Sequence, residues 1–373
     1  MPLVEDFPRN YRFIKNLGKG GEGQVQEFAQ KRTGTLVAVK VIKRRRGGRP
    51  REVGFLSKLP ENDYIIRYLG YFDGWPDWDY YTIVLEHCPG GDLYQFYKKC
   101  TASNDQAVFS EAFMWTVFSQ VAKALAFIHE GVGCRNPRDA EKWRSLIHCD
   151  IRLENILIKS LGTNSTYSSI VIKLADFGLA GYYDPRATGP NHLGTPAYWA
   201  PELDWERLLY TPANDVWAIG AVMHHLAHGF LPIEDPWTTI KRWEKWNAGQ
   251  PYPSNWPIKN EESWWCAYAK REVVPINLEP GSHTEDWRRK RPTPKYSNAL
   301  NDCLSLALKI HAYDRPEAGK LARHIESTRT DVLVKARAGQ ATNDSENMEL
   351  VTGRGISTFR GHPKGDGLRQ RMT

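Results

Sequence analysis

The feature that most constrains the fold of this chain is a change of hydrophobic periodicity near Gly91. Up to Glu86 the chain holds short β-like runs separated by turns with Gly or Asp, namely YRFIKNLG, QVQEFAQ, LVAVKVI, IIRYLGYF and YYTIVLEH. Beyond Gly91 the apolar residues follow helical spacing, as in FMWTVFSQVAKALAFIHE at Phe113, Val117, Val121, Leu125 and Ile128. The pattern predicts an α+β fold, with a small antiparallel sheet followed by a larger, mainly helical part.

The composition is that of a packed globular protein. A chain of 373 residues with 41% hydrophobic residues can form one large two-lobed domain or two ordinary domains. The six cysteines follow neither a zinc-binding nor a disulfide spacing, and the N-terminus has no leader pattern. No stretch approaches the roughly 18 to 20 apolar residues of a membrane span. We therefore expect a soluble intracellular protein without a membrane span, cytoplasmic or, as an alternative, nuclear.

The net charge of +7 includes a basic run, KRRRGGRPR, at residues 43–51. A solvated connecting loop is the simplest interpretation, and a nuclear-localisation or phosphate-binding patch is the alternative. Because the positive charge is concentrated there and not spread along the chain, a nucleic-acid partner is not expected.

Residues 17–25 read LGKGGEGQV and place Gly18, Gly20 and Gly23 in G-x-G-x-x-G-x-V spacing between two β-like runs. Glycines let a backbone fold closely over phosphates, but a Gly-rich hairpin is common and a dinucleotide-binding turn shares the spacing. The dinucleotide turn should open a helix, whereas Val25 begins another strand. The pattern favours a phosphate-covering loop only together with its neighbours.

Lys40 ends the otherwise apolar stretch LVAVK, fifteen residues after Val25. An isolated Lys at this place would be read as an exposed strand end. Glu52 shares a helix face with Leu56 and Leu59, so it can point back toward Lys40 and hold it against nucleotide phosphates, although a first-turn Glu is also favoured by the helix dipole. Pro50 follows soon after Lys40 and predicts that this helix is short.

Residues 147–158, IHCDIRLENILI, set Asp150 five residues before Asn155, and Asp176 follows in the tripeptide DFG. Oxygen atoms of Asn155 and Asp176 suit an octahedral Mg²⁺ that also binds phosphate. Asp150 is placed to accept the proton of a substrate hydroxyl.

Together with GTPAYWAPE at 194–202, NDVWAIGAVMHHLAHG from Asn214 and AYDRP around Arg315, these motifs resemble the eukaryotic protein kinase superfamily. The resemblance covers about residues 11–328 and implies a two-lobed kinase fold: a small antiparallel β-sheet lobe with one helix, and a larger mainly helical lobe. It also implies ATP and Mg²⁺, with Mn²⁺ as an alternative, and a protein substrate. Thr195 follows the serine/threonine pattern, while Arg152 is a feature of some tyrosine kinases.

The resemblance also implies the roles of individual residues. The predicted catalytic set is Asp150, Lys40, Glu52, Arg152, Asn155 and Asp176, and Asn155 and Asp176 are the metal ligands. Leu85 would be the gatekeeper at the hinge VLEHCPGGDL, and Val25, Ala38 and Leu157 would enclose the adenine, although any apolar trio could equally be core. The full nucleotide-binding set is Leu17, Gly18, Gly20, Gly23, Val25, Ala38, Lys40, Glu86, Cys88 and Leu157.

The expected domain organisation follows from the same motifs and from breaks in periodicity. We expect an N-terminal extension at 1–10 and a kinase domain at 11–328, with a small lobe at about 11–87 and a large lobe at about 91–328. Insertions are expected at about 131–145, 160–169 and 232–294. Apolar periodicity is lost after Asp331, so residues 329–373 are expected to form a disordered tail.

Two residues depart from the family pattern in the catalytic loop (147–158). Arg152 stands where the family has Lys, and we expect it to contact the γ-phosphate. Cys149 stands where the family has an Arg that receives an activation-segment phosphate, so we expect the activation segment (176–202) not to depend on phosphorylation. Lys173, Arg186 or another cation could replace the missing Arg.

The resemblance implies further structural contacts. Asp215 is expected to bond the backbone of the catalytic loop, Arg315 to pair with Glu202, and Thr195 to contact Asp150.

Three functions remain open from the sequence. The first is a protein serine/threonine kinase, and the second is a pseudokinase that binds partners, as the departures at Cys149 and Arg152 could indicate. A small-molecule kinase is the third, and the Ala-Pro-Glu segment (194–202) with Arg315 disfavours it. The substrate, the pathway and the oligomeric state do not follow from the sequence.

Overall fold

The computed structural model describes residues 7–19, 23–44, 50–102, 109–186, 194–203, 210–234, 238, 266–267, 269–279, 282 and 294–352. The chain divides into two units, Met1–Ser327 and Thr328–Thr373. Among the described residues, no helix combines the length and the apolarity that crossing a bilayer requires.

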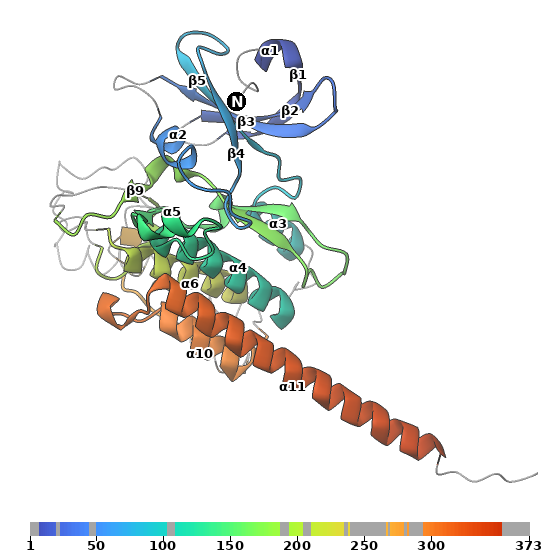
Figure 1. Ribbon diagram of the computed structural model, residues 1–373. Helices are drawn as coiled ribbons and strands as arrows, with labels where there is room; N and C mark the ends of the chain where they lie inside the picture. The colour runs from blue at the N-terminus through green and yellow to red at the C-terminus, as the bar shows by residue number, and fades with distance from the viewer. Residues whose placement is uncertain are drawn as a thin grey trace, which may run out of the picture. The chain divides into compact units, whose positions relative to one another are not determined.

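The N-terminal part is a five-stranded antiparallel sheet with the strand order β1-β2-β3-β5-β4 (Figure 1). The third strand lies at the centre of the sheet and is therefore buried along almost its whole length. Its buried side chains are apolar except that of Lys40. The strands are β1 (Tyr11–Lys19), β2 (Gly23–Gln30), β3 (Leu36–Lys43), β4 (Tyr68–Asp73) and β5 (Tyr80–Glu86).

An aromatic cluster at one end of the sheet includes a residue that precedes the predicted domain. Phe7, in the one-turn helix α1 (Phe7–Asn10), is 0% exposed and stacks on Tyr11 at 4.7 Å between ring centroids. Phe28 and Trp75 pack around the same ring. The boundary between extension and domain stays a prediction, but the side chain of Phe7 belongs to the core of the small lobe.

The helix that carries Glu52 is short, as the position of Pro50 predicts. Helix α2 (Arg51–Leu56) has six residues and begins directly after Pro50, which needs no hydrogen-bond partner for its nitrogen. Val53 and Leu56 are buried, and Glu52 lies on the same inward side. This orientation directs the carboxylate of Glu52 toward the sheet.

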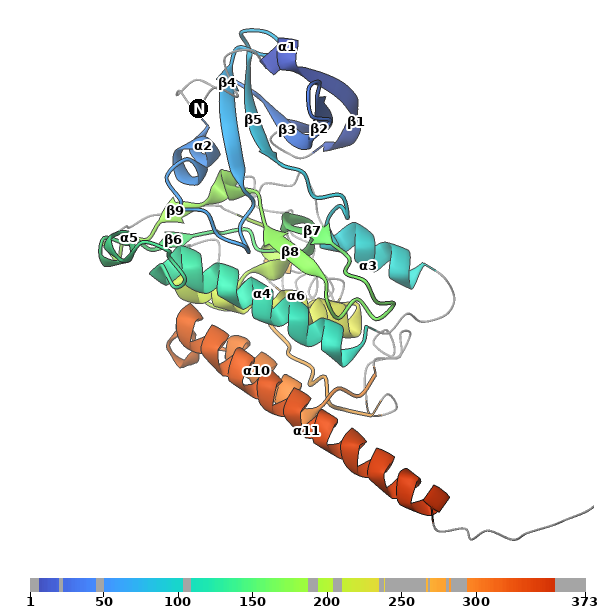
Figure 2. The same ribbon diagram turned by 45° about the vertical axis from the view of Figure 1, so that its right-hand side comes forward.

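The C-terminal part is mainly helical (Figure 2). At its centre, α4 is capped by Ser110, which accepts a hydrogen bond from the backbone of Phe113, and ends at Gly131 with φ 70°. The five apolar positions predicted for the inner face of α4 are all 2% exposed or less. The helices are α3 (Leu93–Thr101), α4 (Glu111–Glu130), α5 (Pro137–Glu141), α6 (Pro212–His228), α10 (Asn298–Ala307) and α11 (Ala318–Thr352).

Two small two-stranded sheets carry the loops of the predicted site. The pairs are β6 (Leu146–Ile147) with β9 (Gly181–Tyr182), and β7 (Ile156–Ser160) with β8 (Val171–Leu174). Short 3-10 helices lie at η1 (Leu153–Asn155), η2 (Phe177–Leu179), η3 (Pro196–Tyr198) and η5 (Ala312–Asp314). The two-lobed α+β fold expected from the sequence is therefore present.

The predicted insertions differ in how they are integrated. In the first (131–145), Trp143 packs edge-on against Phe127 and donates a hydrogen bond to the carbonyl of Ile128 at 3.0 Å. The second (160–169) connects β7 to β8. The third (232–294) lies mostly outside the described residues, but its part at 269–279 is described.

The C-terminal tail differs from the expectation over part of its length. Helix α11 continues through the predicted disordered segment to Thr352, and residues 353–373 lie outside the described residues. Arg, Lys and Ala, which favour helices, occur in this stretch, and helix propensity does not require the apolar periodicity on which the tail prediction rested.

Candidate active site

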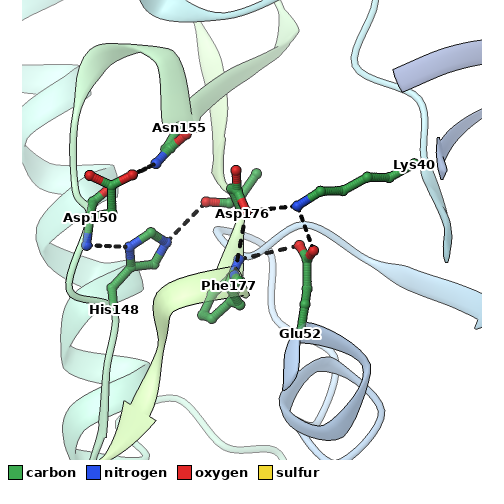
Figure 3. Close-up of polar contacts among 9 residues, drawn as sticks. Lys40, Glu52, His148, Asp150, Asn155, Asp176 and Phe177 are labelled. Carbon is green, nitrogen blue, oxygen red and sulfur yellow. Dashed lines mark hydrogen bonds and ion pairs between the residues drawn. The ribbon is translucent and has the colours of Figure 1, made fainter. Parts of the chain in front are cut away.

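The structure brings Lys40 between two carboxylates (Figure 3). Its Nζ lies 2.7 Å from Oε2 of Glu52 and 2.8 Å from Oδ1 of Asp176, and its side chain is 8% exposed. Burial alone would lower the pKa of Lys40, but the charges of Glu52 and Asp176 outweigh it and raise the pKa above its ordinary value. Lys40 is therefore charged at neutral pH, and the ion pair predicted with Glu52 is present.

The pKa values of Glu52 and Asp176 shift in opposite directions, although both carboxylates pair with Lys40. Glu52 is 1% exposed, and burial holds its pKa above the ordinary value in spite of Lys40. Burial also acts to raise the pKa of Asp176, but Lys40 outweighs it and the pKa of Asp176 lies below its usual value. Oε1 of Glu52 also accepts a hydrogen bond from the backbone N–H of Phe177 at 3.3 Å, so α2 holds the DFG tripeptide directly.

Asp150 is held from two sides. The hydroxyl of Thr195 donates to its Oδ1 at 2.8 Å, and Nδ2 of Asn155 donates to its Oδ2 at 3.0 Å and to its carbonyl at 2.7 Å. The expected contact between Thr195 and Asp150 is present. The carboxylate thus has a defined orientation, which general-base chemistry requires.

The loop around Asp150 is fixed by buried groups. Asp215 of α6 accepts backbone N–H bonds from His148 at 2.7 Å and Cys149 at 3.0 Å, as the sequence predicts. The backbone N–H of Asp150 donates to Nδ1 of His148, and Nε2 of His148 donates to the carbonyl of Ala175 at 2.9 Å. This pairing assigns the proton to Nε2 and links the catalytic loop to the DFG tripeptide (Figure 3).

The donor atoms of Asn155 and Asp176 fit a magnesium ion. Because the amide nitrogen of Asn155 donates to Asp150, its amide oxygen is the atom left to face a cation. Oδ1 of Asp176 accepts from Lys40 and from the backbone of Gly178, and the side chain is 44% exposed. Oδ2 of Asp176 accepts no hydrogen bond from the described residues, so hard oxygen ligands of the kind that Mg²⁺ prefers are present.

The strand register places the predicted nucleotide-binding residues on one face of the sheet. Val25 is paired with Lys40 and Ala38 with Leu85, and directly paired residues share a face. Leu157 of β7 forms a bridge with Asp92 just beyond the hinge. Val25, Ala38 and Lys40 therefore share one face of the sheet, and the enclosure of adenine between this face and Leu157 stays a prediction.

The three loop glycines have different structural roles. A Cβ on Gly23 would lie 2.1 Å from the carbonyl oxygen of Val41, so packing against β3 requires this glycine. A Cβ on Gly18 would meet no atom within 4 Å, so the space next to Gly18 is open to a ligand. Gly20 lies outside the described residues, and Leu17, at the start of the loop, is 43% exposed.

The hinge is braced by charged groups that contact Glu86. Glu86 pairs with Lys173 at 2.9 Å and Lys159 at 3.1 Å and accepts the backbone N–H of Arg67. Burial would raise the pKa of Glu86, but these contacts lower it. The carbonyl of Glu86 and the backbone of Cys88 stay the predicted contacts for adenine, and Lys173 is engaged at the hinge and does not replace the Arg missing at 149.

Cys149 has a strained position and a nearby cation that the sequence analysis missed. Its φ is 67°, and a Cβ on Gly194 would lie 2.2 Å from its carbonyl oxygen, which explains the glycine there. Burial and then Asp215 hold the pKa of the Cys149 thiol well above its usual value, while the positive charge of Arg51 acts in the opposite direction. Arg51 donates to the carbonyl of Ala180 at 2.9 Å.

Arg51 is therefore one of the cations near the start of the activation segment. Its position next to Glu52 is the only signal in the sequence that could have indicated it. Arg186, the other candidate on the described part of the activation segment, has an exposed side chain, and its backbone bonds the Asp184 side chain.

Arg152 is engaged within the chain. Its guanidinium contacts both carboxylate oxygens of Glu154, at 2.8 Å and 2.5 Å, and donates to the hydroxyl of Thr195 at 2.7 Å. Hydrogen bonding to Glu154 is the main cause that raises the pKa of Arg152, so it carries its charge throughout. The predicted contact to a γ-phosphate stays a prediction.

The end of the activation segment is locked by Arg315, as the sequence predicts. Its guanidinium donates to both carboxylate oxygens of Glu202, at 2.7 Å and 2.6 Å, and its side chain is fully buried. It also donates to the backbone carbonyls of Ala213 and Lys309, so it joins three segments. A bidentate guanidinium pair of this kind fixes geometry as well as adding stability.

Comparison with known proteins matches this arrangement. The chain matches the family described as "Protein kinase domain" over residues 11–325. It is 31% identical over 230 residues to "Probable serine/threonine-protein kinase nek2" of Dictyostelium discoideum, covering 60% of this chain and 50% of that protein.

Two further relatives align over a larger share of the chain. "NUAK family SNF1-like kinase 2" of Rattus norvegicus is 26% identical over 331 residues, which are 79% of this chain and 48% of that protein. "Serine/threonine-protein kinase 1" of Arabidopsis thaliana is 30% identical over 325 residues, which are 86% of this chain and 31% of that protein. The chain thus spans half or less of the length of these relatives.

Proposed function

The chain belongs to the protein kinase family, and on this premise we propose that it transfers the γ-phosphate of ATP, in a Mg²⁺-dependent reaction, to Ser or Thr hydroxyls of protein substrates. The proposal rests on two groups of contacts, one around Lys40 and one around Asp150. Lys40 is held by Glu52 and Asp176, and Asp150 is held by Thr195 and Asn155. Phosphoryl transfer depends mainly on such positioning and on charge stabilisation.

Each residue has a defined part in the proposed reaction. Lys40 holds the α- and β-phosphates, Asn155 and Asp176 hold Mg²⁺, and Asp150 accepts the proton of the acceptor hydroxyl. A bond forms between the hydroxyl oxygen and the γ-phosphorus while the bond from that phosphorus to the β,γ-bridging oxygen breaks, and ADP leaves. Bound Mg²⁺ would supply positive charge to the phosphates, and Mn²⁺ is the alternative ion.

The pseudokinase alternative rests on Cys149 and Arg152. Neither departure removes a group that touches the nucleotide, the metal or the acceptor in the proposed reaction. Cys149 lies against Asp215 behind the catalytic loop, and Arg152 keeps a positive charge beside Asp150. Arg51 supplies a cation near the position that Cys149 leaves neutral. These contacts favour the active enzyme.

The substrate class is supported by separate observations. The bond from Thr195 to Asp150 is what the serine/threonine pattern requires, and the relatives named above include serine/threonine-protein kinases. The pair of Glu202 with Arg315 supports the protein substrate over a small molecule, because it holds the Ala-Pro-Glu segment in one shape.

The location is part of the same proposal. We place the protein inside the cell, in the cytoplasm with the nucleus as the alternative. The spacing of the six cysteines, which matches no disulfide framework, supports a reducing compartment. A nucleic-acid partner is not part of the proposal.

The test is incubation of the purified chain with labelled ATP and Mg²⁺ and a panel of basic, acidic and neutral Ser, Thr and Tyr peptides, followed by phosphoamino-acid analysis. The control is Asp150→Asn, which should lose about 10²- to 10⁴-fold in rate because the general base is removed. A thermal shift with ATP and Mg²⁺ should be kept in this variant. Binding without transfer by the parent chain would support the pseudokinase, and equal transfer by Asp150→Asn would show that another group accepts the proton.

A further inference from the structure

A buried arginine inside the predicted third insertion contacts the Ala-Pro-Glu segment. Arg271 is 9% exposed, and its guanidinium donates to the carbonyls of Trp199 at 2.8 Å and Pro196 at 3.2 Å. The same side chain donates to the carbonyls of Cys266 at 2.8 Å and Ala269 at 2.7 Å. Arg271 therefore joins two backbone segments that are about seventy residues apart in the sequence.

The partners of Arg271 in these bonds are all neutral carbonyls. Burial lowers the pKa of Arg271 to about 10, and Cys266 and Glu202, the charged or titratable groups that act on it, oppose this only in part. Both oxygens of Glu202 already bond Arg315. Among the described residues no carboxylate forms an ion pair with Arg271, and a buried cation is costly to keep without one. The planar guanidinium, with several donors, can satisfy four carbonyls at once.

Two of the carbonyls that Arg271 bonds, those of Pro196 and Trp199, lie close in the sequence to the residue that contacts Asp150. Pro196 begins the 3-10 helix η3 (Pro196–Tyr198), and Trp199 follows its last residue. The residue before η3 is Thr195, whose hydroxyl bonds Asp150 at 2.8 Å. In the described part of the chain, the hydrogen bonds of Arg271 reach neither Lys40 nor the strands of the small lobe.

We propose that Arg271 is a positioning residue for the protein substrate, because it holds the Ala-Pro-Glu segment in the shape that an acceptor polypeptide needs beside Asp150. This inference rests on the proposed kinase function and deepens it. Because the bonds of Arg271 reach the Ala-Pro-Glu segment, we expect its loss to lower kcat/KM for the peptide and to leave nucleotide binding unchanged.

The experiment compares Arg271→Lys and Arg271→Met with two controls. Lys270→Met changes the exposed neighbour, and Leu321→Ala removes a fully buried side chain at the start of α11 and lowers stability without touching the segment. Steady-state kinetics give KM and kcat for the best peptide of the panel and for ATP, and thermal shifts give ATP binding, at a temperature where every variant is folded.

We expect Arg271→Lys to lower kcat/KM for the peptide by about tenfold or more, since a lysine ammonium cannot replace the fork, while KM for ATP changes by less than about twofold. The buried lysine should also lose its proton at mildly alkaline pH, so its peptide kcat/KM should fall further there, which the parent should not show. Unchanged peptide kinetics in Arg271→Lys would overturn the inference. So would a loss of peptide and ATP use in the same proportion, as Leu321→Ala should show.

Hydrogen exchange keeps the inference testable if the parent chain transfers no phosphate. The backbone amides of residues 197–200 should exchange faster in Arg271→Lys than in the parent, and Leu321→Ala should not change them selectively. Absent transfer by the parent would refute the proposed function alone. Unchanged exchange in Arg271→Lys would refute the role of Arg271, whatever the activity of the parent.

Discussion

Replacing Glu52 by Gln should separate the function of the buried ion pair from its effect on stability. The amide keeps the shape of Glu52 and one carbonyl oxygen that can still accept from Lys40, while its NH2 group, which replaces the other oxygen, cannot accept the backbone N–H of Phe177. The substitution removes the negative charge of Glu52, which competes with Asp176 for the ammonium group of Lys40. Lys40 should then pair more strongly with Asp176, which the proposal assigns to the metal.

The size of the effect follows from the contacts. A hydrogen bond to a charged group contributes about 1.5–3 kcal/mol and a neutral one about 0.5–1.5 kcal/mol, so the substitution weakens the hold on Lys40 by roughly 1–1.5 kcal/mol. This corresponds to about a five- to twelvefold loss in kcat/KM for ATP. Burial holds the pKa of Glu52 above its ordinary value, which means that the buried carboxylate itself is costly, and the amide relieves this cost. The melting temperature should therefore change little.

The measurement is kcat/KM for ATP at saturating peptide, with thermal melting of the same preparations. Glu111→Gln is the matched control, because Glu111 also accepts hydrogen bonds from within the chain, from Trp115 and Ser297, but lies in the large lobe at the start of α4. Unchanged kcat/KM in Glu52→Gln would refute the role given to the pair. An equal loss in Glu111→Gln would show that the effect is not specific to the site.

Three further predictions concern the metal, the catalytic loop and the activation segment. Asp176→Ala should abolish the Mg²⁺-dependent part of the thermal shift with ATP, because a carboxylate ligand is removed, and a retained shift would contradict its assignment. Arg152→Ala should lower kcat by about tenfold with little change in KM for ATP, and kinetics equal to the parent would reduce Arg152 to a partner of Glu154. Phosphatase treatment of the purified chain, checked by mass spectrometry, should leave the initial rate unchanged, because the Cys149 thiol cannot pair with a phosphate and Arg51 already donates to the carbonyl of Ala180. A loss that returns on rephosphorylation would show the interpretation of Cys149 to be wrong.

The sequence by itself was sufficient for the order of the elements and for groups that act over short, regular distances. Alternation and helical spacing follow from backbone geometry, so the sheet and the inner face of α4 were predictable. Asp150 and Asn155 lie in one short loop, and the placing of Pro50 limits the length of α2. The family motifs then indicated which distant groups should meet, such as Lys40 with Glu52.

Contacts between segments that no motif connects were decided by the tertiary structure alone. Phe7 precedes the matched region but fills the core of the small lobe, because only packing shows which aromatic side chain is enclosed. Arg51 lies in a basic run that predicts a solvated loop, yet folding brings it to Ala180 and close to Cys149. Arg271 lies in a stretch that was expected to be an insertion, and no motif singled it out.

The physical reason is that a charged side chain has the same exposed-loop signature in the sequence whether it faces water or carbonyls. Burying Arg271 is favourable only when four acceptors from two segments converge on it, and convergence is a property of three-dimensional packing. Likewise, Gly194 resembles any turn glycine until the carbonyl of Cys149 lies where its Cβ would be. Local propensity and spacing therefore determined the framework and the motif residues, while close approach between distant segments decided which additional side chains support them.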